Sequence, residues 1–195
     1  MKRSVIPNML IITALIMVLF LLNVALGSVS IPTRAAWNIL WGASDQDPIW
    51  TNIILKSRVP QTLVAIVAGA GLAISGLHMQ TVFRNPLAGP SVLGICSGAS
   101  LGVAFVVLLS GSIGGVALSR LGFAGDLAMT VGAIAGALAV MALIVYVSQR
   151  VKGNVTLLII GVMIGYVANA IIGVLKYFSV EEDIRAYVVW GLGSF

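Results

Sequence analysis

Side chains that could do acid–base, thiol or metal chemistry are few in this sequence. It contains one histidine, His78, and one cysteine, Cys96, and both lie within apolar stretches. A metal centre or an activated nucleophile needs several such groups at a fixed spacing, and no second ligand or base accompanies either residue. We therefore interpret Cys96 as a small buried residue and His78 as a packing or hydrogen-bonding side chain. We assign no catalytic residue and no metal ligand.

The sequence also lacks a phosphate-binding loop. Nowhere does Gly-x-x-x-x-Gly-Lys precede Ser or Thr, which is the arrangement that holds nucleotide phosphates. The chain is therefore not expected to be an enzyme or to carry a cofactor, and any ATP would be hydrolysed on a separate subunit. The net charge of +5 is interpreted as loop charge rather than as a nucleic-acid surface, so no nucleic-acid partner is expected.

The dominant feature is a series of apolar runs. A helix of about 20 residues crosses the ~30 Å hydrocarbon core, and pairs its own backbone polar groups as lipid requires. With 59% hydrophobic and 9% charged residues, the chain is too apolar for a water-soluble fold. We predict an all-α, polytopic transmembrane helical bundle forming a single domain over residues 1–195, with about five spans at 9–26, 61–79, 92–109, 127–147 and 156–175.

The first run raises two alternatives, a secretory signal and a retained first helix. Signal h-regions have about 7–15 residues, and the run over 9–26 is longer, so we favour retention. The loops at 80–91 and 148–155 are short and contain only basic charges, Arg84, Arg150 and Lys152. This density favours a cytoplasmic N-terminus. Five spans would then place the C-terminal residues outside.

Small residues recur at four-residue intervals within the spans. Such stripes let helix backbones approach closely in lipid. They comprise Ala65, Gly69 and Ala73; Gly94, Gly98 and Gly102; Gly132 and Gly136; and Gly161, Gly165, Asn169 and Gly173. Asn169 introduces a polar amide, which either bonds a neighbouring helix or faces a wet pathway. The sequence leaves these two alternatives open.

The loop between the second and third spans contains Arg84-Asn85-Pro86-Leu87-Ala88 and a second proline, Pro90. Proline donates no backbone hydrogen bond and prevents a continuous helix, and Asn before Pro favours a turn. The residues alone predict a rigid inner turn between two packed helices.

Several blocks in this region resemble the FecCD-type permeases, the membrane subunits of ABC importers for iron–siderophore complexes, haem and cobalamin. The blocks are residues 57–63, 76–80, the inner-loop motif Arg84, Asn85, Pro86, Leu87 and Ala88, and 93–99. The resemblance continues to residues 190–194 and so covers essentially the whole chain. Members of this family have about ten spans, so this chain resembles the N-terminal half.

The resemblance implies several partners: a cytoplasmic ABC ATPase, an extracytoplasmic substrate-binding protein and a second permease subunit. It places the chain in the cell inner (plasma) membrane as a multi-pass protein. The family presents two arginines to the binding protein at the outer start of the second helix. Arg58 matches the first, Gln61 replaces the second, and Lys56 supplies a nearby charge. An ion pair of this kind mostly sets orientation and association rate. The alternative is that Arg58 anchors the helix end at the lipid headgroups.

The resemblance also implies that the fifth span lines the translocation pathway, which assigns pathway or helix-packing roles to Gly161, Gly165, Asn169 and Gly173. We interpret the acidic run Glu181-Glu182-Asp183 that follows as a solvated loop. The main ATPase-coupling loop of the family lies beyond the sixth helix, which this chain lacks. We therefore expect the 195 residues to transport nothing by themselves.

Two functional hypotheses follow. The first is a permease subunit of an importer for iron uptake as siderophore, or for haem or cobalamin-type metal chelates. The alternative is a truncated, non-transporting membrane protein, either an inactive remnant or an assembly partner. A secondary-transporter half built from inverted repeats is not supported, because residues 57–98 match the permease blocks.

Overall fold

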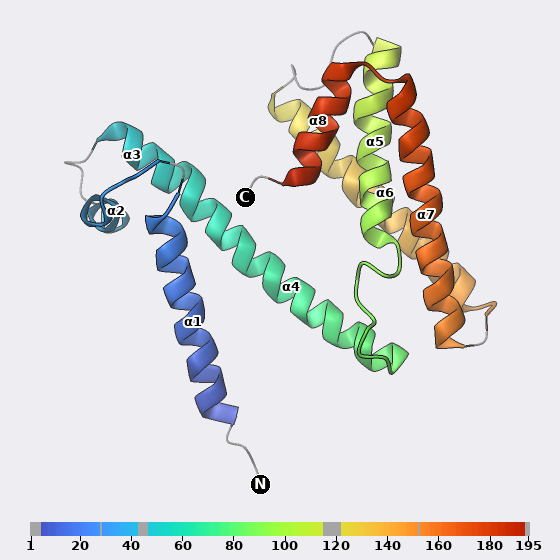
Figure 1. Ribbon diagram of the computed structural model, residues 1–195, viewed down its shortest axis with the longest axis horizontal. Coiled ribbons are helices and arrows are strands. Elements are labelled where there is room, and N and C mark those ends of the chain that lie inside the picture. The colour runs from blue at the N-terminus through green and yellow to red at the C-terminus, as the bar shows by residue number, and fades with distance from the viewer. Residues whose placement is uncertain (1–4, 28, 43–46, 115–121, 152, 194–195) are drawn as a thin grey trace. The chain divides into compact units, whose positions relative to one another are not determined.

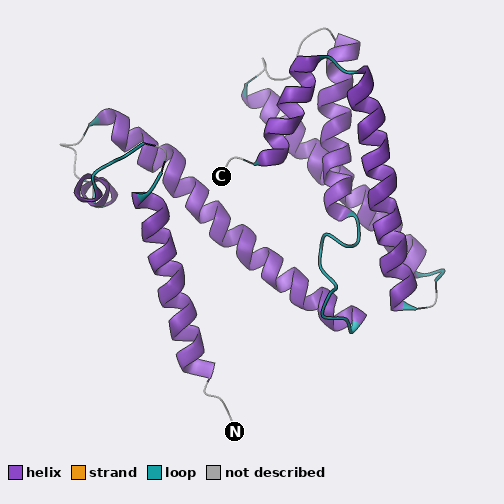
Figure 2. Cartoon of the chain, viewed as in Figure 1, coloured by secondary structure: helices purple, strands orange, loops and turns teal. Residues whose placement is uncertain are grey.

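The computed structural model describes residues 5–27, 29–42, 47–114, 122–151 and 153–193, and their regular structure is helical (Figures 1 and 2). The predicted all-α class is confirmed. The elements in order are α1 (Val5–Ala25), α2 (Thr33–Leu40), α3 (Pro48–Ile53), the π-helical turn η1 (Ile54–Arg58), α4 (Val59–Phe83), α5 (Ile95–Gly114), α6 (Phe123–Ser148), α7 (Asn154–Phe178) and α8 (Glu181–Leu192).

Within the described part of the chain, four continuous helical stretches are long and apolar enough to cross a membrane: Ile6–Ala25, Pro48–Phe83, Phe123–Ser148 and Asn154–Phe178. They match four of the five predicted spans. The remaining predicted span, the third in sequence order at 92–109, corresponds to α5. That helix begins only at Ile95, because Gly94 adopts a left-handed φ of +73°. The helix then continues to Gly114, five residues beyond the predicted end.

The stretch Pro48–Phe83 contains the π-helical turn η1, in which the Val59 N–H donates to the Ile54 carbonyl five residues earlier. Pro60 follows directly. Proline has no N–H for the carbonyl four residues before it, here that of Lys56, and its ring crowds that carbonyl. A wider turn relieves this conflict without ending the helix. The sequence around Pro60 thus explains why the helix widens here rather than stopping.

Contacts divide the chain into two compact units, Met1–Gly71 and Leu72–Ser194, with the boundary inside α4. In the first unit, the short helix α2 is amphipathic. It buries Ala35, Ala36 and Ile39 against Val24 of α1 and Ile54 of η1, and exposes Trp37. A single domain over the whole chain stays a prediction.

The second unit is organised around α5, which contacts α6, α7 and α8 (Figure 1). In the described part of α5, four residues within two turns of the helix are essentially inaccessible to solvent: Val103, Ala104, Val107 and Leu108. Ile172 of α7 and Tyr187 of α8 complete this cluster. The helix at the centre of this unit is therefore α5, which corresponds to the span predicted at 92–109.

The contact of α5 with α6 has almost no space between the backbones. A Cβ built on Gly98 would lie 2.7 Å from the carbonyl oxygen of Gly136, and one on Gly102 would overlap the carbonyl of Gly132. No real side chain tolerates this, so glycine is required at the crossing. The predicted packing roles of these four glycines are confirmed. The stripe on α4 differs: Ala65, Gly69 and Ala73 are exposed within the described residues, so packing there stays a prediction.

We expect Gly102→Ala to lower the free energy of unfolding of the second unit by about 1–3 kcal/mol, the usual cost of overpacking. The matched control is Gly173→Ala on α7, where an added Cβ meets nothing within 4 Å. That change should be neutral, or stabilising by up to about 1 kcal/mol through helix propensity. Thermal unfolding of purified protein in detergent measures both. Equal effects at the two positions would contradict the close-contact explanation.

Candidate functional site

Arg58, the arginine expected to meet a binding protein, is buried in the first unit with 6% of its surface exposed. Its Nη1 donates to the carbonyls of Val24 (2.8 Å) and Ala25 (3.1 Å), and its Nη2 donates to the carbonyl of Val29 (2.6 Å). Val24 and Ala25 are in the last turn of α1, where carbonyls lack intrahelical partners and a cation is favoured by the helix dipole. Docking through Arg58 stays a prediction, and the guanidinium is turned into the chain.

Three neighbours complete the surroundings of this side chain. Thr62 Oγ1 lies 2.6 Å from the Arg58 carbonyl oxygen and 2.7 Å from Asn23 Oδ1, and its one hydroxyl hydrogen serves one acceptor at a time. A Cβ on Gly27 would lie 2.6 Å from Arg58 Nη2, so a larger residue here would have to displace the guanidinium. We call Arg58, Thr62, Asn23 and Gly27 the Arg58 cluster. Lys56, in the same turn, is exposed.

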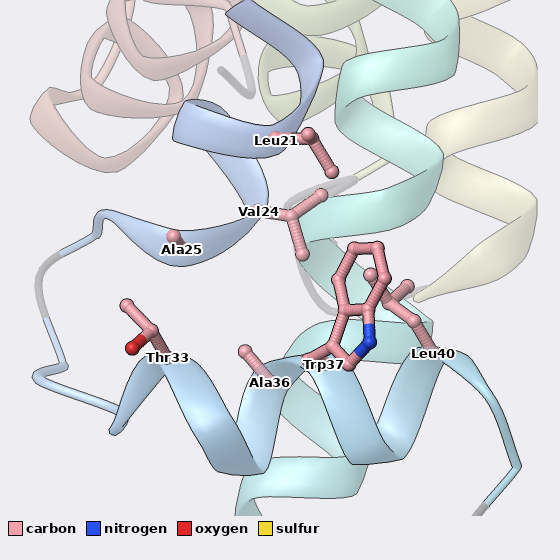
Figure 3. Close-up of a pocket in the computed structure, with 7 residues that line it drawn as sticks. All are labelled: Leu21, Val24, Ala25, Thr33, Ala36, Trp37 and Leu40. Atoms are coloured by element: carbon pink, nitrogen blue, oxygen red, sulfur yellow. The ribbon is translucent and has the colours of Figure 1, made fainter. Parts of the chain in front are cut away.

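Next to this cluster, an apolar crevice runs between the end of α1 and α2 (Figure 3). Leu21, Val24 and Ala25 line it from α1, and Ala36, Trp37 and Leu40 from α2. Thr33 contributes a hydroxyl group and Trp37 an indole N–H. A substrate site normally combines an apolar wall with several convergent polar groups. The crevice therefore lacks the convergent polar groups expected of a substrate site.

The inner-loop motif begins with the end of α4, which is closed by a Schellman arrangement. The Asn85 N–H donates to the Gln80 carbonyl (3.2 Å), and the Arg84 N–H donates to the Thr81 carbonyl (3.3 Å). This motif needs a left-handed residue that is usually glycine. Here Arg84 fills it with a φ of +48°, although a Cβ makes that conformation unfavourable.

The next residues form a tight turn that fixes the path of the loop. Asn85 Oδ1 accepts a hydrogen bond from the Leu87 N–H (2.9 Å), and the Ala88 N–H donates to the Asn85 carbonyl (3.1 Å). Pro86 occupies the second position of this turn, where its fixed φ is favourable. The turn predicted from the sequence is present, and its rigidity stays a prediction.

Two adjacent residues of this loop, Leu87 and Ala88, differ in how much of their side chains is exposed. Ala88 is buried at 2% exposure and packs in one cluster with Phe83, Leu93 and, from α6, Val140. Leu87 points the other way and is 84% exposed. Asn154, the first residue of α7, donates from Nδ2 to the Val82 carbonyl (3.0 Å). The motif thus joins the ends of α4, α6 and α7 and presents one apolar side chain outward.

The predicted stripe on α7 divides into two pairs. Gly161 and Gly165 are buried against the residues just before α5: a Cβ on Gly161 would lie 2.7 Å from Leu93 Cα, and Gly165 lies beside Gly94. Both glycines thus lie in close backbone contacts, and their assignment to a pathway or packing role stays a prediction. Asn169 and Gly173 are exposed, and the buried positions further along are Ala168 and Ile172.

Helix geometry explains this division. Each residue turns the helix by about 100°, so a four-residue step overshoots a full turn by about 40°. Three steps from Gly161 to Gly173 add up to about 120°, which carries the stripe off the contact face. Placing all four residues on one face was therefore wrong. A pathway role for Asn169 and Gly173 stays a prediction.

The acidic run after α7 is not the solvated loop expected from sequence. Glu181, Glu182 and Asp183 form the first turn of α8. Asp183 is 2% exposed, and its Oδ2 has no hydrogen-bond partner among the described residues. Burial, and then the neighbouring Glu182 carboxylate, raise the pKa of Asp183 above its usual value. The sequence signal that was missed is the four-residue step from Asp183 to Tyr187, which is also buried.

Tyr187 connects α8 to two other helices. Its hydroxyl group hydrogen-bonds the side chain of Ser100 on α5, and Lys176 Nζ of α7 lies 4.6 Å from the centre of its ring. A cation over an aromatic face is stabilising. Burial raises the pKa of the Tyr187 phenol, so it stays protonated at neutral pH.

His78, on α4, is exposed, and its Nδ1 lies 2.8 Å from the Ile74 carbonyl. That distance assigns the ring hydrogen to Nδ1, which agrees with the predicted hydrogen-bonding role. No group of three or more His, Cys, Asp or Glu suitable for a metal occurs within the described ranges.

Replacing Arg84 by glycine should remove the left-handed strain. We expect Arg84→Gly to raise the free energy of unfolding by about 1 kcal/mol. Arg84→Ala is the control, because it removes the charge but keeps a Cβ, and it should leave stability nearly unchanged. Chemical or thermal unfolding in detergent distinguishes them. If both variants change stability equally, the guanidinium and not the backbone sets the effect.

Stability should also depend on the protonation of Asp183. Because its pKa is raised in the folded state, this group favours folding most below its ordinary pKa of 3.8, and this contribution is lost as pH rises through the raised value. Asp183→Asn should raise stability at neutral pH by about 1–3 kcal/mol and flatten the pH profile. Glu181→Gln, exposed in the same turn, is the control. A profile unchanged by Asp183→Asn would contradict this assignment.

Comparisons with known proteins agree with this architecture. The haemin transport system permease HmuU of Yersinia pestis is 36% identical over 180 residues, which cover 91% of this chain and 52% of that protein. A vitamin B12 import system permease, BtuC of Pectobacterium atrosepticum, is 33% identical and matches 80% of this chain and 44% of its own length. A probable iron chelatin permease of Helicobacter pylori is 41% identical over 73% of this chain and 39% of that protein.

A solved structure gives the same result. It is described as an inward-facing conformation of a metal-chelate type ABC transporter, and it superposes with a TM-score of 0.69 at 26% identity over 94% of this chain and 52% of that one. The chain thus spans about half the length of the proteins that it matches. The family model for the FecCD transport family matches residues 15–195. With this match over most of its length, the chain belongs to the FecCD transport family.

Proposed function

We propose that this chain is part of the membrane permease of an ATP-driven importer for a metal chelate. The observation that carries the proposal is the family match over residues 15–195 together with the shared helical arrangement. Relatives are named for haemin, vitamin B12, iron chelatin and molybdate. These names span several ligands, so the proposal commits to the class of metal-containing solutes, with iron–siderophore, haem and cobalamin as its members.

In this proposal the permease lies in the inner membrane. A cytoplasmic ABC ATPase supplies the energy, since the sequence contains no phosphate-binding loop of its own. A substrate-binding protein delivers the solute from outside, and a second permease subunit completes the pathway. The exposed residues Asn169 and Gly173 of α7 are free to line that pathway or to meet the second subunit.

The inner-loop motif supports the proposal through its rigidity. Its Schellman end, Asx turn and buried Ala88 hold the ends of three helices in one arrangement. A permease driven from the cytoplasm needs stiff connections on that side, because movement of a loose loop would not reach the helices. The loop has this property whichever solute is carried.

The test is uptake in the organism that encodes the chain. Deleting the gene should abolish energy-dependent uptake of one of four labelled probes: a ferric siderophore, haemin, cobalamin or molybdate. The gene supplied in trans should restore it, because in this proposal the delivered solute crosses the membrane through the permease. The other three probes serve as internal controls. Unchanged uptake of all four would contradict the proposal and favour a non-transporting membrane protein.

A further inference from the structure

The Arg58 cluster has the features of an internal connection rather than of a docking surface. The Arg58 guanidinium makes three hydrogen bonds to main-chain carbonyls that are 29 to 34 residues away in sequence. Hydrogen bonds to a charged group are about twice as strong as neutral ones. Separating Arg58 from these carbonyls to reach another protein would break one buried and two part-buried hydrogen bonds. Leaving the buried Val24 carbonyl without a partner is costly.

We propose that Arg58 is a positioning residue: it holds the end of α1 and the connection that leads to α2 against η1, and the cation presented by this turn is Lys56. Val24 and Ala25 end α1, and Val29 lies in the connection to α2. One planar group thus joins the end of α1 to the middle of that connection. The second part of the proposal rests on the proposed importer function, and the first does not.

The chemistry of the side chain favours arginine at this position. A guanidinium offers several donors in a fixed fork, whereas a lysine ammonium is a compact point charge on a flexible stem. Nη1 serves Val24 and Ala25 while Nη2 serves Val29. A lysine would keep the charge but could not span both groups of acceptors. Charge conservation alone should therefore fail to preserve the arrangement.

Gly27 gives an independent indication of the same role. The nearest atoms to its hypothetical Cβ are Nη2, Cζ and Nε of Arg58, at 2.6, 2.8 and 2.9 Å. The connection after α1 therefore passes directly over the guanidinium. A side chain at residue 27 would have to displace Arg58, so the main chain here is shaped around this group.

Fixing this connection also fixes what it leads to. α2 packs its buried face on Val24 and Ile54, and Ile54 begins the turn that ends at Arg58. Lys56 lies between Ile54 and Arg58 with its side chain exposed. Of the two cations in η1, Arg58 is buried. Lys56 is therefore the cation of this turn that a negatively charged partner can reach. An exposed cation of this kind affects association rate and its salt dependence.

Arginine-selective labelling tests the positioning role directly. The purified chain in detergent is treated with phenylglyoxal, and modification of each arginine is followed by mass spectrometry. Arg34, Arg84 and Arg185 are exposed and provide internal references. Arg58 should react at least about tenfold more slowly, since every ~1.4 kcal/mol of opening free energy is a factor of ten. Labelling of Arg58 at the rate of the references would overturn the proposal.

Variants give the matched controls. Gly27→Ala should bring Arg58 labelling to within about threefold of Arg34 labelling, since the added methyl displaces the guanidinium from its acceptors. Arg58→Lys and Arg58→Gln should lower the thermal midpoint equally, whereas Lys56→Gln should leave it unchanged. If Arg58→Lys keeps wild-type stability while Arg58→Gln does not, charge and not the hydrogen-bonding fork is responsible, and the positioning role is wrong.

A third measurement addresses Lys56. Affinity for the substrate-binding protein of the same importer should fall, and lose salt dependence, in Lys56→Gln but stay unchanged in the folded fraction of Arg58→Lys. If Arg58→Lys lowers affinity instead and Lys56→Gln does not, assignment of the outer cation to Lys56 is wrong. If no variant and no wild-type chain binds any such protein, the importer proposal fails, while the labelling result for Arg58 still stands.

Discussion

Close approach of helix backbones is the constraint on which the second unit depends. Helices in lipid gain little from hydrophobicity when they associate, so packing requires small residues at the contact. Gly98 and Gly102 bring α5 against α6, and Gly94 brings the residues before α5 against Gly161 of α7. The larger residues of α5 are then inaccessible. Without these glycines the helices would lie further apart, and neither the inner loop nor α8 would have a surface on which to pack.

Two buried charged side chains, Arg58 and Asp183, differ in whether their polar atoms have hydrogen-bond partners. Arg58 is paired with three carbonyls, whereas Asp183 Oδ2 is unpartnered among the described residues. The difference has a physical meaning, because an unpaired buried carboxylate is costly unless it is protonated or meets a donor. The Arg58 guanidinium is stabilised by its acceptors. The surroundings of Asp183 instead favour its protonated form, which agrees with the direction in which burial moves its pKa.

Much of the fold follows from the sequence, because span length and apolar composition depend on the bilayer alone. The glycines of α5 and α6 were also predictable from spacing. What the sequence did not specify was angular detail. A four-residue repeat drifts around the helix, so Asn169 left the contact face, and Asp183 was taken for part of a loop although its spacing to Tyr187 puts both on one buried face. The direction of Arg58 depends on carbonyls that only the folded α1 brings near it, and no local pattern in residues 56–61 contains that information.

The π-helical turn η1 has a consequence for how this region tolerates change. A turn with bonds to the fifth preceding residue holds one residue more than an α-helical turn. Pro60 lacks an N–H and crowds the preceding turn, so the extra residue is needed as long as proline stays at this position. Ile54 and Arg58, at the two ends of the turn, are both buried, and an insertion or deletion between them would rotate one relative to the other by about 100°. The exposed positions Leu55 and Ser57 should therefore accept substitutions far more readily than the segment accepts insertions or deletions.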